Sequence, residues 1–234
     1  ALVPKIFSFF KCSGRLPLVK CFKYKSSFHA IQRFRDDYGL CVNGIPMLIE
    51  TIKTSRILKA ISVKDGLMSK QIEADFTKTP KGRSIQLLTE YGSQYSAGGD
   101  KALIDFLKGP SSYMTGSWQG YEGVNIEAII DLNKKTQISE LSTGFLQDWN
   151  AWIFMPEWVD YYASNDGEKF RKLGRVINKV DEKKDDVVLQ DFTLKINTSS
   201  RYIKVIAKNR KYNPNWHRAP GGTCWIFADE ISIN

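Results

Sequence analysis

The chain has 234 residues, of which 42% are hydrophobic and 25% are charged, a composition typical of globular proteins. No apolar run approaches the roughly 20 residues that a membrane-spanning helix needs, so we expect no membrane insertion. The net charge is +9, and the first 75 residues hold 13 Lys and Arg against 6 Asp and Glu. These basic residues are scattered among apolar ones and match no nucleic-acid-binding motif, so nucleic acid is not an expected partner.

Cysteine and histidine are too sparse to indicate a transition-metal site. The histidines are His29 and His217, and the cysteines are Cys12, Cys21, Cys41 and Cys224. Their spacing matches no zinc pattern, and it gives no support to a Cys–His nucleophile pair. A disulfide among the first three cysteines stays open, as does the redox compartment.

The first third of the chain predicts a small β-sandwich-like region over residues 1–79. Residues 1–44 show no sustained periodicity, and their apolar start lacks the charged leader and cleavage site of a signal peptide. Strands are predicted at residues 45–52, 56–63 and 70–76, with a turn at residues 64–66. Residues 79–82, Thr-Pro-Lys-Gly, form the predicted linker to a second domain at residues 80–234.

The second domain is a series of short strand patterns separated by polar turns. In residues 125–132, for example, Ile126, Ala128 and Ile130 would share one face. Asp166-Gly167 suits the tight turn of a hairpin between residues 159–164 and 169–176. The predicted strands cover residues 84–89, 125–132, 136–145, 159–164, 169–176, 187–196, 201–209 and 225–233. With no helical crossovers between them, they indicate an all-β antiparallel sandwich.

The chain is organised around residues 97–123, which contain six glycines and the large aromatics Tyr113, Trp118 and Tyr121. A stretch so rich in glycine predicts an ordered loop, because glycine allows positive φ angles and close backbone approach. Its aromatic rings would either pack the loop or form a platform for a flat ligand. A long turn that merely opens the sandwich explains the pattern equally well.

A set of motifs follows in a fixed order through this half of the chain. They are Gly98-Gly99, ALID (102–105), WQGYEG (118–123), AIIDL (128–132), LSTGFLQD (141–148), WIFMP (152–156), the S-x-D-G of Ser164 to Gly167, RYIKVIAKN (201–209) and WIFADEI (225–231). With these motifs, residues 85–234 resemble the C-terminal discoidin-like (coagulation factor C-type, galactose-binding-like) domain of bacterial chitobiase/β-hexosaminidase-type glycosidases. That family's fold is an eight-stranded jelly roll. Residues 45–78 resemble part of the small β-sandwich that precedes it in the same enzymes, whereas residues 1–44 depart from it. Phe106 is a second departure, since the family usually has Gly there.

Catalysis within this chain is not expected. The enzymes that the chain resembles use an adjacent Asp-Glu pair, and Asp229-Glu230 offers one only superficially. Neighbouring strand residues point to opposite faces, so these two carboxylates would not converge on one substrate. The catalytic pair of those enzymes also belongs to a (β/α)₈ barrel, whose alternating strands and helices this sequence lacks.

We expect a carbohydrate-binding module instead. Sugars present flat apolar C–H faces, so aromatic rings at a loop end, with a few polar donors, form a plausible site. Trp118 and Trp225 adjoin strands and are expected in the core. The expected glycan-binding residues lie in loops: Tyr95, Tyr121, Trp149, Trp152, Trp216, His217 and Arg218. A lone histidine such as His217 is more often structural than functional.

The resemblance implies one structural Ca²⁺, since many discoidin-like domains hold one between the loop after the first strand and the last strand. Hard oxygen ligands suit this ion. By motif position, its side-chain ligands would be Asp105 and Glu230, and its carbonyl ligands those of Ala102, Leu107 and Asp229. In the alternative, Asp105 simply caps a turn.

The resemblance further implies partners and a location. The partners would be GlcNAc- or galactose-containing glycans and a catalytic glycosidase domain, in cis or in trans. The location would be periplasmic, cell-surface or secreted, in bacteria. The alternative function is a spacer or protein-interaction module of a glycosidase without sugar affinity.

Overall fold

The computed structural model describes residues 80–234 throughout, residues 70–71, and the strands of the first part of the chain. By contact, the chain divides into two compact units, Ala1–Lys81 and Gly82–Asn234. No helix among the described residues is long and apolar enough to cross a membrane.

The described part of the first unit consists of short antiparallel pairs. One sheet has the order β1-β3-β2, and β4 pairs with β7 and β5 with β6. The predicted strands at residues 45–52, 56–63 and 70–76 are confirmed in β3, β4 and β7. The turn at residues 65–66 and the residues Cys12 and Cys21 lie outside the described residues. The bounds are β1 (His29–Arg33), β2 (Cys41–Val42), β3 (Ile45–Thr51), β4 (Arg56–Ala60), β5 (Val63–Lys64), β6 (Leu67–Met68) and β7 (Ile72–Phe76).

The second unit is an antiparallel jelly-roll sandwich, as predicted, with seven hydrogen-bonded strands. Its strands are β8 (Ser84–Leu87), β9 (Gln119–Glu122), β10 (Ile126–Gln147), β11 (Trp158–Ser164), β12 (Arg171–Ile177), β13 (Val188–Ala207) and β14 (Trp225–Ile233). Four short 3₁₀ helices lie in its loops: η1 (Ser93–Tyr95), η2 (Ala102–Ile104), η3 (Tyr113–Thr115) and η4 (Trp149–Ala151).

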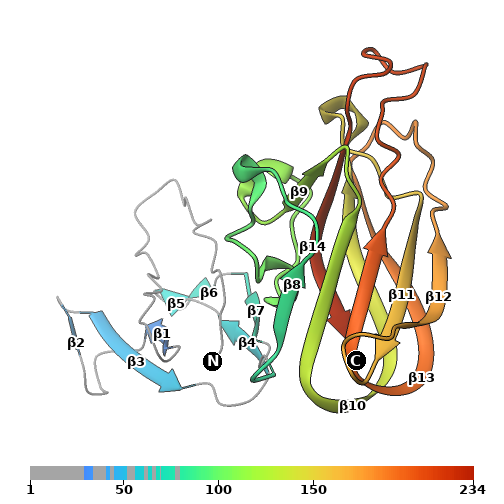
Figure 1. Cartoon of the computed structure of the whole chain (residues 1–234). Helices are drawn as coiled ribbons and strands as arrows, with labels where there is room; N and C mark the ends of the chain where they lie inside the picture. Colours follow the sequence, from blue (N-terminus) through green and yellow to red (C-terminus); the bar gives the residue numbers. More distant parts are fainter. Residues whose placement is uncertain are drawn as a thin grey trace. The chain divides into compact units, whose positions relative to one another are not determined.

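Two long strands join the two layers of this sandwich. The first part of β10 pairs with β8 and with the end of β13, which in turn pairs with β11. The second part of β10 pairs with β14 and with the start of β13. The register shift between Asp131 and Thr136 marks the bend of β10, where Asn133 has φ 71° (Figure 1). The sequence predicted a separate strand on each side of this bend, and likewise on each side of the matching bend in β13. The structure instead carries each of these two segments through as one strand. Together with β9, which was not predicted, this gives seven strands rather than the eight predicted.

The core lies between the layers and follows the period-2 pattern. Ile126, Ala128 and Ile130, predicted to share a face, are all at most 1% exposed. Val159 and Tyr161 on β11 are also fully buried in the same cluster. The predicted hairpin is confirmed, because β11 pairs with β12 and Gly167 has φ 80° in the turn between them. Strand β9 was not predicted, since its glycine-rich surroundings indicated only a loop.

Candidate functional site

Two loops meet at the end of the sandwich opposite the bend of β10 (Figure 1). One connects β10 to β11 and contains η4, which ends at Trp152 in the left-handed conformation, with φ 66°. The other connects β13 to β14 and is closed by the Asn213 N–H, which donates to the Gly222 carbonyl at 2.7 Å. Their rings form the aromatic cluster, which consists of Trp149, Trp152, Phe154, Trp216 and His217.

The aromatic cluster brings together four of the seven predicted glycan-binding residues. Trp149 and Trp216 meet edge to face at 5.6 Å between ring centroids, and His217 lies 6.0 Å from Trp152. The three tryptophans are half-buried, so each keeps part of its ring in solvent. Offset and edge-to-face contacts of this kind stabilise each pair by about 1 kcal/mol beyond burial. The loops thus hold the indole rings in fixed orientations.

His217 is a structural connection between the two loops. It is 3% exposed, and its Nδ1 accepts a hydrogen bond from the Ala219 N–H at 3.1 Å. The proton of the neutral ring is therefore on Nε2, which donates to the Trp149 carbonyl at 2.8 Å. Arg218 is exposed and donates to the Asn150 carbonyl, which adds a second tie between the loops.

Trp216 is held in place by Glu182, which Arg210 binds in turn; the sequence did not predict either contact. Its Nε1–H donates to Glu182 Oε1 at 2.7 Å, and Arg210 binds the other carboxylate oxygen at 2.6 Å. Burial raises the pKa of Glu182, but the hydrogen bonds from Arg210 and Trp216 lower it more, and the net shift is downward. The Lys183 ammonium lies over the Trp216 ring, 5.4 Å from its centroid. The run at residues 181–186 was interpreted as a solvated loop, and nothing in the sequence pairs it with Trp216.

Two other predicted binding residues lie away from the aromatic cluster. Tyr121 is fully buried in the main core, so the prediction of an accessible ring is wrong; its strand pairs with β14 and burial raises the pKa of its phenol. Tyr95 packs edge to face on Trp225 at 5.2 Å and on Phe227 at 4.8 Å. Trp118 is 1% exposed, as predicted, whereas Trp225 is half-buried rather than fully in the core.

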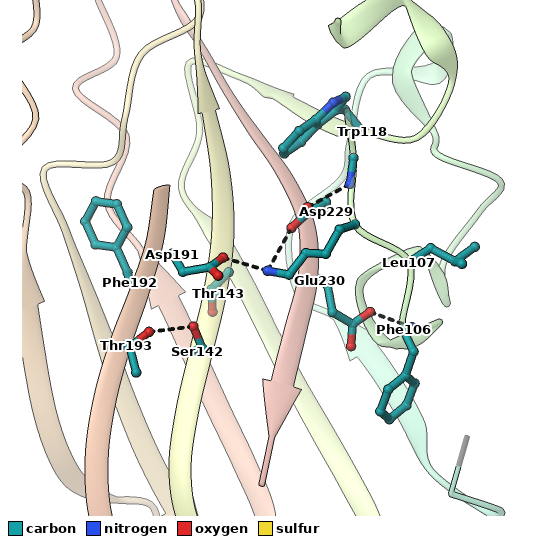
Figure 2. Close-up of polar contacts among 12 residues, drawn as sticks. Phe106, Leu107, Trp118, Ser142, Thr143, Asp191, Phe192, Thr193, Asp229 and Glu230 are labelled. Carbon is teal, nitrogen blue, oxygen red and sulfur yellow. Dashed lines mark hydrogen bonds and ion pairs between the residues drawn. The ribbon is translucent and has the colours of Figure 1, made fainter. Parts of the chain in front are cut away.

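The carboxylates of Asp229 and Glu230 reach the same loop, contrary to the alternation expected for neighbouring strand residues. A register shift between Thr143 and Phe145 places both residues opposite Gly144, and such a β-bulge interrupts the alternation. Glu230 Oε2 accepts the Phe106 N–H and Asp229 Oδ2 accepts the Gly109 N–H, each at 2.8 Å (Figure 2). They are only 2% and 3% exposed, so the pair is closed to a substrate.

The Lys108 ammonium lies between the carboxylates of Asp191 and Asp229, next to Gly144. Lys108 Nζ is 2.6 Å from Asp191 and 3.8 Å from Asp229 (Figure 2). A Cβ on Gly144 would lie 2.2 Å from Asp229 Oδ1, so only glycine leaves room for this carboxylate. Burial raises the pKa of Asp229, and Lys108 opposes that shift.

Glu230 occupies the position predicted for a Ca²⁺ ligand. Its Oε1 is buried and has no hydrogen-bond partner within the described part of the chain. Burial, opposed by the Phe106 N–H and reinforced by the nearby Asp105, raises the pKa of Glu230 to about 9. Phe106 has φ 66°, a left-handed conformation that glycine adopts freely, which explains the glycine usual at this position of the family. Asp105 Oδ1 also accepts the Leu107 N–H at 3.0 Å, the turn-capping contact of the alternative interpretation.

The candidate ligands combine two carboxylates with backbone carbonyls. No group of three or more His, Cys, Asp or Glu side chains is placed to hold a metal among the described residues. A set with only Asp105 and Glu230 as side-chain ligands is compatible with that finding. The buried, unpaired oxygen of Glu230 fits a hard cation, since a buried carboxylate without a partner is costly.

A family comparison matches residues 84–220 to the F5/8 type C domain. Similar solved structures include CBM32-1 from a family 31 glycoside hydrolase of Clostridium perfringens, at 17% identity, covering 66% of this chain and 95% of that one, with a TM-score of 0.43. The C-terminal domain of a chitobiase from Bacteroides fragilis is 18% identical and covers 67% and 95%, with a TM-score of 0.43. CpGH89CBM32-5 from Clostridium perfringens, in complex with GalNAc-β-1,3-galactose, is 19% identical and covers 66% and 96%, with a TM-score of 0.42. No curated protein matches the chain. Because the matched residues run from β8 through β13 and make up more than half of the sequence, the chain belongs to the F5/8 type C (discoidin-like) domain family.

Proposed function

We propose that the second unit is a non-catalytic carbohydrate-binding module whose site is the aromatic cluster. The observation that carries this proposal is the convergence of three half-buried tryptophans from two loops at one end of the sandwich. Their rings are held by packing, and that of Trp216 also by its hydrogen bond to Glu182, so little side-chain freedom is lost when a ligand binds. Rigid, aromatic loop residues are a common feature of small-molecule sites.

Trp152 is the ring on which we expect a sugar to stack. Its left-handed backbone follows directly from η4, and the ring lies next to Gly222, where an added Cβ would be 3.1 Å from it. Glycine at residue 222 therefore keeps space beside the indole. Arg218 is exposed nearby and carries guanidinium donors that can reach ligand hydroxyls.

The ligand class and the biological setting are part of the same proposal. We propose GlcNAc- or galactose-containing glycans, the class to which the ligand of CpGH89CBM32-5 belongs. The module would serve a glycosidase of the chitobiase/β-N-acetylhexosaminidase type, in cis or in trans. The location would be periplasmic, cell-surface or secreted.

A spacer without sugar affinity is the second candidate, and one observation favours it. Three polar groups at the cluster already have partners within the chain: His217 binds the Trp149 carbonyl, Trp216 binds Glu182, and Arg218 binds the Asn150 carbonyl. The Trp149 Nε1–H is buried and has no hydrogen-bond partner among the described residues. A ligand would then rely on the rings and on the remaining guanidinium donors of Arg218, or replace one of these contacts. The spacer proposal predicts that no sugar perturbs the cluster.

We further propose that the loop at residues 102–110 and strand β14 hold one Ca²⁺. The ligands would be the carboxylates of Asp105 and Glu230 and the carbonyls of Ala102, Leu107 and Asp229. The unpaired, buried Oε1 of Glu230 supports this proposal. The ion would bind directly to the Glu230 oxygen that has no hydrogen-bond partner, and it would brace the loop against the last strand; it would take no part in sugar chemistry.

The experiment is a two-dimensional ¹H–¹⁵N NMR titration of the full chain with galactose, GlcNAc and chitobiose to tens of millimolar. We expect saturable shifts of the indole N–H signals of Trp152 and Trp216, lost in Trp152→Ala. Trp158→Ala is the matched control, because Trp158 is also half-buried but lies on β11 with its ring covered by Arg175 at 3.7 Å. Shifts that survive Trp152→Ala would overturn the assignment of the site. No shifts with any sugar would favour the spacer.

A further inference from the structure

A groove separate from the aromatic cluster lies beside the start of β14. Its volume is about 470 Å³, and three segments line it: the residues that follow β8, the end of β9 and the start of β14. The lining residues used below are Glu90, Tyr91, Gly92, Gln94, Glu122 and Trp225. Neither the fold nor the proposed site for neutral sugars assigns a role to this groove.

The apolar wall of the groove is the indole of Trp225. Trp225 is half-buried, and Tyr95 packs edge to face against it, which fixes the ring. A Cβ on Gly92 would lie 2.8 Å from two ring atoms of Trp225, so only glycine allows the loop to lie flat against the indole. The Gly92 N–H donates to the Gly120 carbonyl at 2.8 Å and anchors the loop to β9. The wall is therefore preformed.

The polar wall of the groove is acidic. Glu122 pairs directly with Trp225 across the β9–β14 ladder, and side chains of such a pair share one face of the sheet. Glu90 lies on the loop that follows β8, and both glutamates are exposed. In a chain with a net charge of +9, two carboxylates beside an indole face form a local site for a cation. Gln94 adds an amide that can donate to or accept from a hydroxyl.

Backbone hydrogen bonds join the strand end that carries Trp225 to the loop that carries Trp152. The Trp225 N–H donates to the Trp152 carbonyl at 2.9 Å, and the Trp225 carbonyl accepts the Phe154 N–H at 3.0 Å. The backbone segments that carry Trp152 and Trp225 are therefore neighbours, and a glycan that contacts both rings would connect the two sites. A neutral sugar unit would form no ion pair with the two carboxylates, whereas a sugar unit with an ammonium group would form one.

We propose that this groove binds a 2-amino-2-deoxy sugar unit, with its ring on Trp225 and its ammonium group between Glu90 and Glu122. The inference deepens the proposed function, because it makes the groove a second subsite for glycans in which some amino sugars lack the acetyl group. A free amino sugar carries an ammonium group that pairs with the glutamates beside the indole, whereas an N-acetylated sugar is neutral and cannot. The affinity should fall as salt rises, since exposed charges are screened.

The test is an NMR titration of the full chain with glucosamine and with GlcNAc at matched pH and ionic strength. Glucosamine is expected to shift the Trp225 indole N–H and the Gly92 amide, with at least tenfold weaker binding in Glu122→Gln and in Glu90→Gln. The control Glu168→Gln changes a glutamate that is also exposed but lies in the β11–β12 hairpin and does not line the groove, and it should leave the affinity unchanged. Equal binding of glucosamine and GlcNAc at Trp225, or insensitivity to both groove variants, would overturn the proposal. So would equal binding of Nα-acetyl-lysine, which carries an ammonium group but no sugar ring.

Failure of this proposal can be told apart from failure of the proposed function. GlcNAc shifts at Trp152 without glucosamine shifts at Trp225 would overturn the groove subsite alone. Glucosamine shifts at Trp225 that persist in Trp152→Ala, with no response of Trp152 to any sugar, would overturn the aromatic cluster as a site and leave the groove as the binding site.

Discussion

Replacing Asp160 with Asn should reveal how far a buried carboxylate, paired with two partly exposed cations, stabilises the sandwich. The Asp160 side chain is 3% exposed on β11, and it accepts hydrogen bonds from Arg175 Nε at 2.6 Å, Arg175 Nη2 at 2.7 Å and Lys172 Nζ at 2.7 Å. Both cations come from the paired strand β12. Burial raises the pKa of Asp160, but the hydrogen bonds from Arg175 and Lys172 lower it more, to about 2.

The magnitude follows from the difference between the folded and unfolded pKa values. A folded pKa of about 2 against 3.8 in the unfolded chain corresponds to about 2 kcal/mol of stability. Because the pKa is lowered on folding, this contribution is complete above about pH 5 and declines as the pH falls toward 2. About half of it should be gone at pH 3. The two cations are 44% and 40% exposed, so solvent screening makes this figure an upper value.

The assay is urea denaturation of the wild type and of Asp160→Asn at pH 7, 5 and 3. We expect the variant to be less stable by up to about 2 kcal/mol at pH 7, with a difference that roughly halves at pH 3. Asp131→Asn is the matched control: Asp131 also receives two hydrogen bonds from one arginine, Arg201, but its side chain is 24% exposed. It should cost less than about 1 kcal/mol. A loss for Asp160→Asn that is independent of pH, or no larger than that of Asp131→Asn, would refute the reasoning.

Three further predictions concern other parts of the second unit. Millimolar Ca²⁺ should raise the melting temperature of the wild type but not of Glu230→Gln, measured by calorimetry; an equal rise in both would exclude Glu230 as a ligand. Gly109→Ala should lower the free energy of unfolding by about 3 kcal/mol in urea denaturation, since its Cβ would lie 2.2 Å from the Trp118 ring, and a loss below about 1 kcal/mol would contradict this packing. Cys224 is fully buried and its thiol pKa is raised to about 11 by burial, so peptide mapping should find it alkylated only after denaturation; labelling of the folded chain at pH 8 would contradict its placement.

The strands and the core of the sandwich could be predicted because they depend on local pattern. Alternation placed Ile126, Ala128 and Ile130 on one face, and all three are buried. The bends of β10 and β13 were not predicted. A short polar segment such as residues 133–135 predicts a turn, whether or not the strand continues to pair beyond it. Whether the strand continues depends on its pairing with the neighbouring strand, which is distant in sequence.

The positions of the site residues were predicted less completely, because they depend on contacts distant in sequence. The loop tryptophans were identified by their Asn, Asp, Pro and Gly neighbours. The link between Trp216 and Glu182 spans 34 residues and has no local signature. The bulge at Asp229-Glu230 likewise depends on Gly144 in the facing strand. The sequence around Tyr121 predicted an accessible ring in a loop, but Tyr121 is on β9, which pairs with β14, and its ring is buried.

The central claim is that the aromatic cluster binds glycans, and the most direct measurement is the dissociation constant of the full chain for chitobiose and for galactose. It should be measured by isothermal titration calorimetry, with and without Ca²⁺, for the wild type, Trp152→Ala and Trp158→Ala. We expect a millimolar constant for at least one sugar, at least tenfold weaker binding in Trp152→Ala, and no change in Trp158→Ala. No heat of binding in the folded wild type up to tens of millimolar sugar, or equal affinity in all three proteins, would contradict the claim.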